Sequence, residues 1–194
     1  MNNIPKNITG AILAGGQSTR MGQDKALLTL NGKSFIQRIA EELQKIFTDV
    51  IVISDIASGY DFLHLPVYGD IYKNCGPLSG IHSALVNSNS KSVFIVSVDL
   101  PLANCALMEY IIDRSHAEDT TLLSVDDRIQ PLFGLYNRTC LPVLINHLEE
   151  KQYSVQHFIK NIHSNILPAS PRFIKLLFNI NTRKDYLNLA RLPH

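Results

Sequence analysis

Short apolar segments alternate with amphipathic helical segments in the first half of the chain, and this alternation constrains the fold more than any other feature. Residues 8–14 form a β-branched, apolar run that ends at Gly15-Gly16, which predicts a buried strand followed by a loop. Apolar residues then recur at three- and four-residue spacing over residues 35–46, as expected for a helix that packs on a sheet. The apolar run Val50–Ile53 predicts the next buried strand.

The same alternation continues into a third strand. A helix is predicted to begin at Gly76-Pro77, and residues 93–98 form another apolar run that stops at Asp99. Short apolar strands that alternate with helices are typical of a mostly parallel sheet with right-handed crossovers and helices on both faces. The sequence therefore predicts an α/β, Rossmann-like domain, in which ligands bind beyond the carboxyl ends of the strands.

The second half of the chain carries weaker patterns. They predict strands at Thr120–Val125 and residues 129–136, a helix through residues 141–148, a short strand at residues 177–180 and a helix at residues 183–190. At about 150 residues per domain, a chain of 194 residues corresponds to one domain. We therefore interpret residues 1–194 as a single domain.

Charge and cysteine usage argue against several classes of partner. Lys and Arg total 18 and Asp and Glu total 17, a net charge of +1, so no overall field attracts nucleic acid or an anionic membrane surface. No apolar run approaches the roughly 20 residues that span a bilayer, and the N-terminus lacks a secretory pattern, so we expect a cytoplasmic location without membrane contact. Cys75, Cys105 and Cys140 are widely separated, which favours free thiols over a zinc site.

The segment from Leu13 to Lys25, LAGGQSTRMGQDK, carries the clearest chemical information. Glycines let backbone N–H groups approach phosphate oxygens, and successive N–H groups can form an anion-binding nest. The glycine spacing fits neither the dinucleotide fingerprint G-x-G-x-x-G nor the phosphate loop G-x-x-x-x-G-K-[ST]. A glycine-rich loop with two cations after a buried strand therefore predicts a phosphate site of another kind.

This loop, with the pattern L-A-G-G-x-S-x-R-M-G-x-D-K, resembles that of the nucleotidyltransferases, and its Asp-Lys pair is similar to that of the molybdenum cofactor guanylyltransferases. The resemblance continues in the family's order through GPLSGI at residues 76–81, VDLP at 98–101, QPL at 130–132 and NINT at 179–182. It implies a single nucleotidyltransferase domain that transfers GMP from GTP to the terminal phosphate of molybdenum-loaded molybdopterin, with Mg²⁺ as cofactor and pyrophosphate as product. The partners it implies are GTP, molybdopterin cofactor and enzymes that handle molybdopterin.

Two cations and a carboxylate suit such a reaction, because two phosphate groups must be brought together and their charge neutralised. Arg20 offers a planar fork for the β- and γ-phosphates, and Lys25 a compact charge for the transferred phosphoryl group, so these are the predicted catalytic residues. Asp99 ends an apolar strand, where Mg²⁺ is the natural partner of its carboxylate. The alternatives are solvated loop cations and a turn residue.

The resemblance also implies the remaining site residues. Nucleotide contacts fall on the residues Leu13, Ala14, Gly15, Gly16, Lys25, Asp70 and Asp99. Contacts on the pterin side fall on Ser79, Gly80, Asn179 and Asn181. In an extended segment the two asparagines point to one face, although a pair of turn asparagines explains them equally well.

Three places depart from the family pattern, namely Ser97, Arg183-Lys184 and the stretch Ile53-Ser54-Asp55, where the family usually has an asparagine. The last departure means that no guanine contact can be carried over to that stretch. Two alternatives stay open: a cytidylyltransferase that acts on the same cofactor, and a binding protein that delivers the cofactor without catalysis. The complete set of Arg20, Lys25 and Asp99 favours an enzyme.

Overall fold

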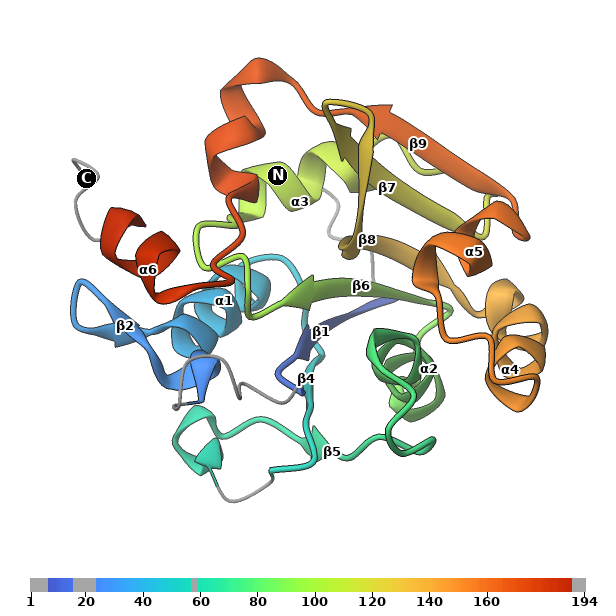
Figure 1. The fold of residues 1–194 in the computed structure, drawn as a ribbon, viewed down its shortest axis with the longest axis horizontal. Helices are drawn as coiled ribbons and strands as arrows, with labels where there is room; N and C mark the ends of the chain where they lie inside the picture. The colour runs from blue at the N-terminus through green and yellow to red at the C-terminus, as the bar shows by residue number, and fades with distance from the viewer. Residues whose placement is uncertain (1–6, 16–23, 57–58, 190–194) are drawn as a thin grey trace.

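A computed structural model describes residues 7–15, 24–56 and 59–189. Seven strands form one sheet in the order β5-β4-β1-β6-β8-β7-β9 (Figure 1). β8 is antiparallel to both of its neighbours, whereas the other pairs in this sheet are parallel, so the predicted mostly parallel sheet is confirmed. The strands of the sheet are β1 (Ile8–Leu13), β4 (Val50–Ile53), β5 (Val67–Tyr68), β6 (Ser92–Ser97), β7 (Thr120–Val125), β8 (Arg128–Asn137) and β9 (Ser164–Pro168).

Helices cover both faces of this sheet, as predicted (Figure 1). The α-helices are α1 (Phe35–Gln44), α2 (Pro77–Asn87), α3 (Cys105–Ile112), α4 (Leu141–Glu149), α5 (Val155–Lys160) and α6 (Arg183–Leu189). Short 3₁₀ turns are η1 (Lys25–Leu27), η3 (Asp61–Leu63), η4 (Arg138–Cys140) and η5 (Pro171–Leu177). None of the helices in the described part of the chain is long and apolar enough to cross a membrane.

Successive residues of β1 point to opposite faces of the sheet, so a separate core forms on each side. Ile12 is buried with Ile39 of α1 and Leu107 of α3. Its neighbours Ala11 and Leu13 are buried on the other side, in a cluster that includes side chains of α2, α4 and α5. Full burial of such a side chain contributes about 1.5–3 kcal/mol, which is why the central strands are apolar on both faces.

Two tight hairpins depend on residues with positive φ. Asn31 (φ 52°) and Gly32 (φ 78°) connect β2 (Thr29–Leu30) to β3 (Lys33–Ser34) in a separate two-stranded ribbon. Asp126 and Asp127, with φ of 48° and 59°, connect β7 to β8 in the same way. Two successive left-handed residues match the twist of an antiparallel pair, and Asn, Asp and Gly tolerate this conformation best.

The predicted strand at residues 177–180 is wrong. Leu177 ends η5, and the three residues after it belong to no strand. Ile180 is buried instead in a third cluster with Leu30, Phe35 and Leu189, so its apolar character comes from packing on the ribbon and on the start of α1. The sheet edge beside β7 is occupied by β9, which the sequence patterns did not reveal.

Gly134 lies in β8 where the pairing with β7 shifts register. A Cβ atom at this position would lie 2.5 Å from Leu122 Cδ2 and 2.6 Å from the Thr121 carbonyl oxygen. We expect Gly134→Ala to lower the free energy of unfolding by about 1–3 kcal/mol through overpacking. Calorimetric unfolding measures this loss, with Gly59→Ala as the control, because its Cβ would make an ordinary 3.8 Å contact with Ile56 Cγ2. Equal melting temperatures for the two variants would contradict the close packing.

Candidate functional site

The carboxyl ends of β1, β4 and β6 lie side by side, because β1 pairs in parallel with both of the other strands. The Ala14 N–H donates to the Ile53 carbonyl at 2.9 Å, and the Val98 N–H donates to the Leu13 carbonyl at 3.2 Å. Leu13, Ala14 and Gly15, the predicted nucleotide contacts, therefore leave the sheet between two neighbouring strand ends. Gly15 is exposed at this position, where an arriving ligand can reach its backbone.

Gly16 and Arg20 lie outside the described residues, which resume at Asp24. Their phosphate contacts remain predictions.

Lys25 and Asp99 form an ion pair, with 2.8 Å between Lys25 Nζ and Asp99 Oδ1. Lys25 is the first residue of η1, directly after the glycine loop, and Asp99 follows the end of β6. Their side chains are 15% and 28% exposed, so the pair is shielded from bulk water yet open on one side. The structure thus brings together the cation and the carboxylate that the sequence analysis singled out, and it holds them where the parallel strands end.

Both oxygens of the Asp24 carboxylate accept hydrogen bonds that hold the start of η1 in place. Oδ1 accepts a hydrogen bond from the Ala26 N–H at 3.0 Å, which is an N-cap, and Oδ2 accepts one from the Tyr60 hydroxyl at 2.7 Å. Burial, and then the Asp24 carboxylate, raise the pKa of the Tyr60 hydroxyl, so it stays a donor. Sequence reasoning missed Tyr60, because nothing in the residues around it marks a partner so far away in the chain.

Asp70 follows the end of β5, beside Asp55 and Lys73. Asp55 Oδ1 accepts from Lys73 Nζ at 2.5 Å and from the Asp70 N–H at 2.9 Å. The hydrogen bond from Lys73 lowers the pKa of Asp55, whereas burial, and then the charge of Asp55, raise the pKa of Asp70. The Oδ1 atom of Asp70 is buried and has no hydrogen-bond partner among the described residues. A buried carboxylate oxygen in this state keeps Asp70 a candidate for the nucleotide contact that the resemblance implies.

Asp70→Asn should stabilise the protein at neutral pH. Because the folded-state pKa of Asp70 is raised, its ionised form disfavours folding, and this effect grows as the pH rises through that pKa. We expect a gain of about 0.5–2 kcal/mol, the range common for a single substitution that relieves an unfavourable charge. Chemical denaturation at several pH values measures it. The gain should vanish at acidic pH, where Asp70 is protonated in both states; a gain that does not depend on pH would contradict this explanation.

The segment around Ile180 is not a strand, yet it contacts the backbone of Asp99. The Ile180 N–H donates to the Asp99 carbonyl at 2.9 Å. Asn179 Nδ2 donates to Gln130 Oε1 at 3.4 Å, and the Asn181 N–H donates to Asp185 Oδ2 at 3.0 Å. The motifs around Asp99, Gln130 and Asn179 therefore meet in space.

Ser79 and Gly80 are buried in the first turns of α2. The Ser79 hydroxyl donates to the Tyr72 carbonyl at 2.5 Å. A Cβ atom on Gly80 would lie 3.4 Å from both methyl carbons of Leu13, so the small residue lets the helix approach the end of β1 closely. Both residues therefore lie behind the end of β1, and their contact with a pterin stays a prediction.

No group of three or more His, Cys, Asp or Glu side chains in the described part of the chain could hold a metal ion by itself. Asp99 offers a carboxylate beside the place where the glycine loop ends. One carboxylate suits Mg²⁺, which commonly takes its other ligands from substrate phosphates and water. The donor set therefore fits a metal that arrives with a nucleotide.

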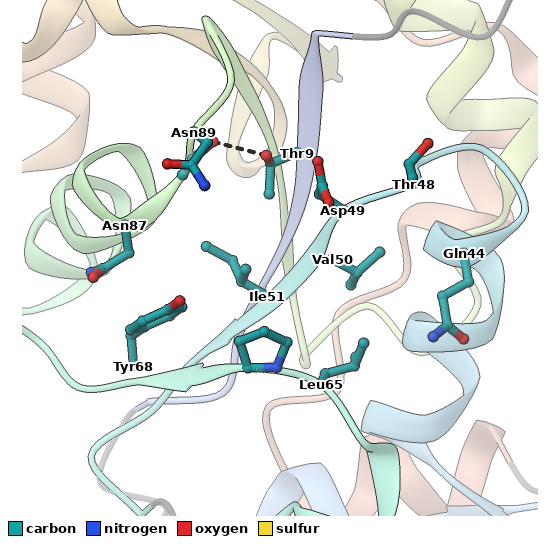
Figure 2. A pocket seen from close by; sticks show the side chains of 12 residues that line it. Thr9, Gln44, Thr48, Asp49, Val50, Ile51, Leu65, Tyr68, Asn87 and Asn89 are labelled. Carbon is teal, nitrogen blue, oxygen red and sulfur yellow. Dashed lines mark hydrogen bonds between the residues drawn. The ribbon is translucent and has the colours of Figure 1, made fainter.

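A cavity of about 250 Å³ lies at the other end of the strands, near the amino-terminal ends of β1 and β4 (Figure 2). Its wall includes Thr9, Asp49 and Ser88. The Ser88 hydroxyl donates to Thr9 Oγ1 at 2.8 Å, so these buried hydroxyls are already satisfied. The cavity contains none of the predicted site residues.

Comparison with known proteins supplies the family. Residues 10–165 match the family described as the MobA-like NTP transferase domain. The chain belongs to this family. Among the relatives of this MobA-like transferase, a probable molybdenum cofactor guanylyltransferase of Carboxydothermus hydrogenoformans is 34% identical over 192 residues, covering 96% of this chain and 97% of the relative. A protein of the same description from Aquifex aeolicus is 26% identical over 191 residues, covering 98% of this chain and 94% of that protein.

Solved structures share the fold of this nucleotidyltransferase. An Aquifex aeolicus protein has a TM-score of 0.80 at 26% identity and covers 90% of this chain and 94% of its own. The molybdopterin-guanine dinucleotide biosynthesis protein A of Archaeoglobus fulgidus has a TM-score of 0.81 at 21% identity, with coverage of 94% and 96%. A Mycobacterium tuberculosis protein, solved as a complex with manganese, has a TM-score of 0.70 at 18% identity, with coverage of 96% and 100%. At these last two identities the likeness shows the fold alone.

Proposed function

We propose that this nucleotidyltransferase transfers GMP from GTP to the terminal phosphate of molybdenum-loaded molybdopterin. A phosphate oxygen of the acceptor bonds to the α-phosphorus of GTP, and the bond from that phosphorus to the bridging oxygen of the β-phosphate breaks, which releases pyrophosphate. The observation that carries the proposal is the Lys25–Asp99 pair, held at the carboxyl ends of parallel strands in a chain of this family. The description of its relatives as guanylyltransferases supports the choice of substrates.

Charge neutralisation is the main requirement of this reaction, because two anionic phosphates must approach each other. Lys25 follows the glycine loop directly and is 15% exposed, so its ammonium group has little water to lose when a triphosphate binds. We propose that Lys25 transfers its contact from Asp99 to phosphate oxygens. In that role it stabilises the charge that develops on the transferred group and on the leaving pyrophosphate. Arg20 and Gly16 complete the phosphate contacts in the proposal.

The released Asp99 carboxylate is then available to Mg²⁺, the proposed cofactor. Asp99 would hold this Mg²⁺, which would supply Lewis acid character to the phosphates of the nucleotide. The manganese complex of the Mycobacterium tuberculosis protein, which shares the fold, supports a divalent cation in this family of structures. Asp70 is proposed to accept a hydrogen bond from the nucleotide through Oδ1, which is buried and has no partner in the part of the chain that the structure describes.

Base recognition is assigned to the backbone of Leu13, Ala14 and Gly15. The Leu13 carbonyl and the Ala14 N–H already take part in hydrogen bonds of the sheet, which makes this turn rigid. A guanine edge is therefore read by the backbone groups of the turn that the sheet does not use. On the acceptor side, we propose that the pterin binds near Asn179 and Asn181. Ser79 and Gly80 lie behind the end of β1 and support this side of the site.

The test is incubation with molybdopterin cofactor, Mg²⁺ and each nucleoside triphosphate in turn, with the dinucleotide and the pyrophosphate identified. GTP should exceed CTP and ATP by about a hundredfold or more in kcat/KM, because each unpaired buried polar group costs about 1–3 kcal/mol. Equal or faster turnover of CTP would make the protein a cytidylyltransferase. Tight cofactor binding without any dinucleotide would instead favour the delivery protein.

A further inference from the structure

Tyr60 is the buried end of a hydrogen-bonded chain that leads to the proposed catalytic lysine. Its side chain is fully buried, and its hydroxyl donates to Asp24 Oδ2 at 2.7 Å. The other oxygen of Asp24 caps η1 through the Ala26 N–H. Lys25 lies between Asp24 and Ala26 in sequence, so hydrogen bonds hold the backbone on both sides of it.

The Tyr60 hydroxyl also lies near the end of a neighbouring strand. Ser54 follows the last residue of β4, is buried and lies close enough to the Tyr60 hydroxyl to offset part of the rise in its pKa that burial causes. The Ser54 hydroxyl accepts a hydrogen bond from the Ile56 N–H at 3.1 Å as well. The hydrogen bond from Tyr60 to Asp24 is therefore made near the end of β4, a strand adjacent to β1.

We infer that Tyr60 is a positioning residue for Lys25, acting through Asp24. A hydrogen bond to a charged acceptor is shorter and stronger than a neutral one, and here it is enclosed by a buried ring. Without it, the Asp24 carboxylate can turn toward solvent and release the first turn of η1. The ammonium group of Lys25 then loses its fixed place beside Asp99. The kinetic test of this role depends on the proposed function, whereas the labelling test does not.

The direct test is chemical labelling of lysines in Tyr60→Phe, which keeps the ring and removes the hydroxyl. Limited acetylation followed by mass spectrometry reports how often each ammonium group leaves its partner. Lys25 should be labelled several times faster than in the unchanged protein, while Lys33, which is 48% exposed and paired with Glu41, serves as the internal reference. Unchanged labelling of Lys25 would overturn the inference.

Tyr136→Phe is the matched control. Tyr136 is also fully buried, and its hydroxyl donates to the Pro131 carbonyl at 2.6 Å within β8, so it does not bond to Asp24. Both variants lose one buried hydroxyl and should be destabilised alike, but only Tyr60→Phe should expose Lys25. Faster labelling of Lys25 in both variants would show general loosening of the fold and would also overturn the inference.

Catalysis gives a second readout. Tyr60→Phe should lower kcat about tenfold with a much smaller change in the KM for GTP, since Lys25 acts on charge that develops during the reaction. In a Lys25→Ala background the same substitution should change kcat little, because the group it positions is gone. Equal effects in both backgrounds would refute the role. If the unchanged protein makes no dinucleotide, the proposed function fails, and the labelling result still decides whether Tyr60 positions Lys25.

Discussion

Replacing Lys25 with alanine should lower kcat by at least about 10²-fold, because one preorganised charge at a developing oxyanion is typically worth about 2.7–4 kcal/mol. The fold should be little affected. Asp99 is 28% exposed in the unchanged protein and becomes more exposed when the lysine side chain is removed, so water can replace the lost ammonium group and limit the loss of stability. Pyrophosphate release under saturating GTP measures kcat, and calorimetric unfolding measures stability.

The matched control for this experiment is Lys33→Ala. Lys33 also forms an ion pair, with 2.7 Å between its Nζ and Glu41 Oε2, but it lies in β3 and is far more exposed. Its loss should leave kcat unchanged. A Lys25→Ala protein that unfolds at much lower temperature, yet keeps normal turnover per folded molecule, would show that Lys25 is only structural.

Asp99→Asn should abolish GMP transfer while leaving much of the binding of GTP intact. The amide is a poor ligand for Mg²⁺, whereas the backbone of the glycine loop and Lys25 still bind phosphate. Binding and chemistry should therefore separate in this variant. The measurements are the magnesium concentration at half-maximal activity and the calorimetric affinity for GTP, each compared with the unchanged protein.

Asp119→Asn is the control for loss of a carboxylate. Asp119 Oδ2 accepts a hydrogen bond from the His163 N–H at 3.0 Å, just before β7, and belongs to no part of the proposed site. It should keep both the magnesium midpoint and the turnover. If Asp99→Asn also kept the magnesium midpoint, Asp99 would be a turn residue and not a metal ligand.

Local sequence patterns are enough to predict helices and strands whose buried residues recur at the spacing of the element. The strand at Val50–Ile53 and the helix Phe35–Gln44 follow from them, because each residue's environment repeats with the geometry of its own element. Residues 177–180 resemble a strand for a different reason. Leu177 and Ile180 are buried in two different clusters and lie three residues apart, so their burial does not follow the two-residue period of a strand. The Asn31-Gly32 pair, by contrast, is a strong sequence pattern for a hairpin turn, so this turn could have been predicted.

The site divides in the same way. Lys25 and Asp99 could be predicted because each follows an apolar strand whose carboxyl end must face the ligand edge of the sheet. The contact between Tyr60 and Asp24 could not be predicted, because no local pattern encodes it. Nor could the Asp70 oxygen that lacks a partner among the described residues, because Lys73 pairs with Asp55.

The hydrogen bond from Ile180 to the Asp99 carbonyl has a consequence for the protein during its synthesis. A chain emerges from the ribosome amino-terminal end first, so Lys25 and Asp99 are available long before residues 179–181 are made. Closing the site requires a contact between residues far apart in sequence, and such contacts form late because the intervening loop must first be ordered. A nascent chain therefore contains Lys25 and Asp99 well before the segment that bonds to the Asp99 carbonyl, and the proposed acceptor side of the site can form only after residues 179–181 have been made.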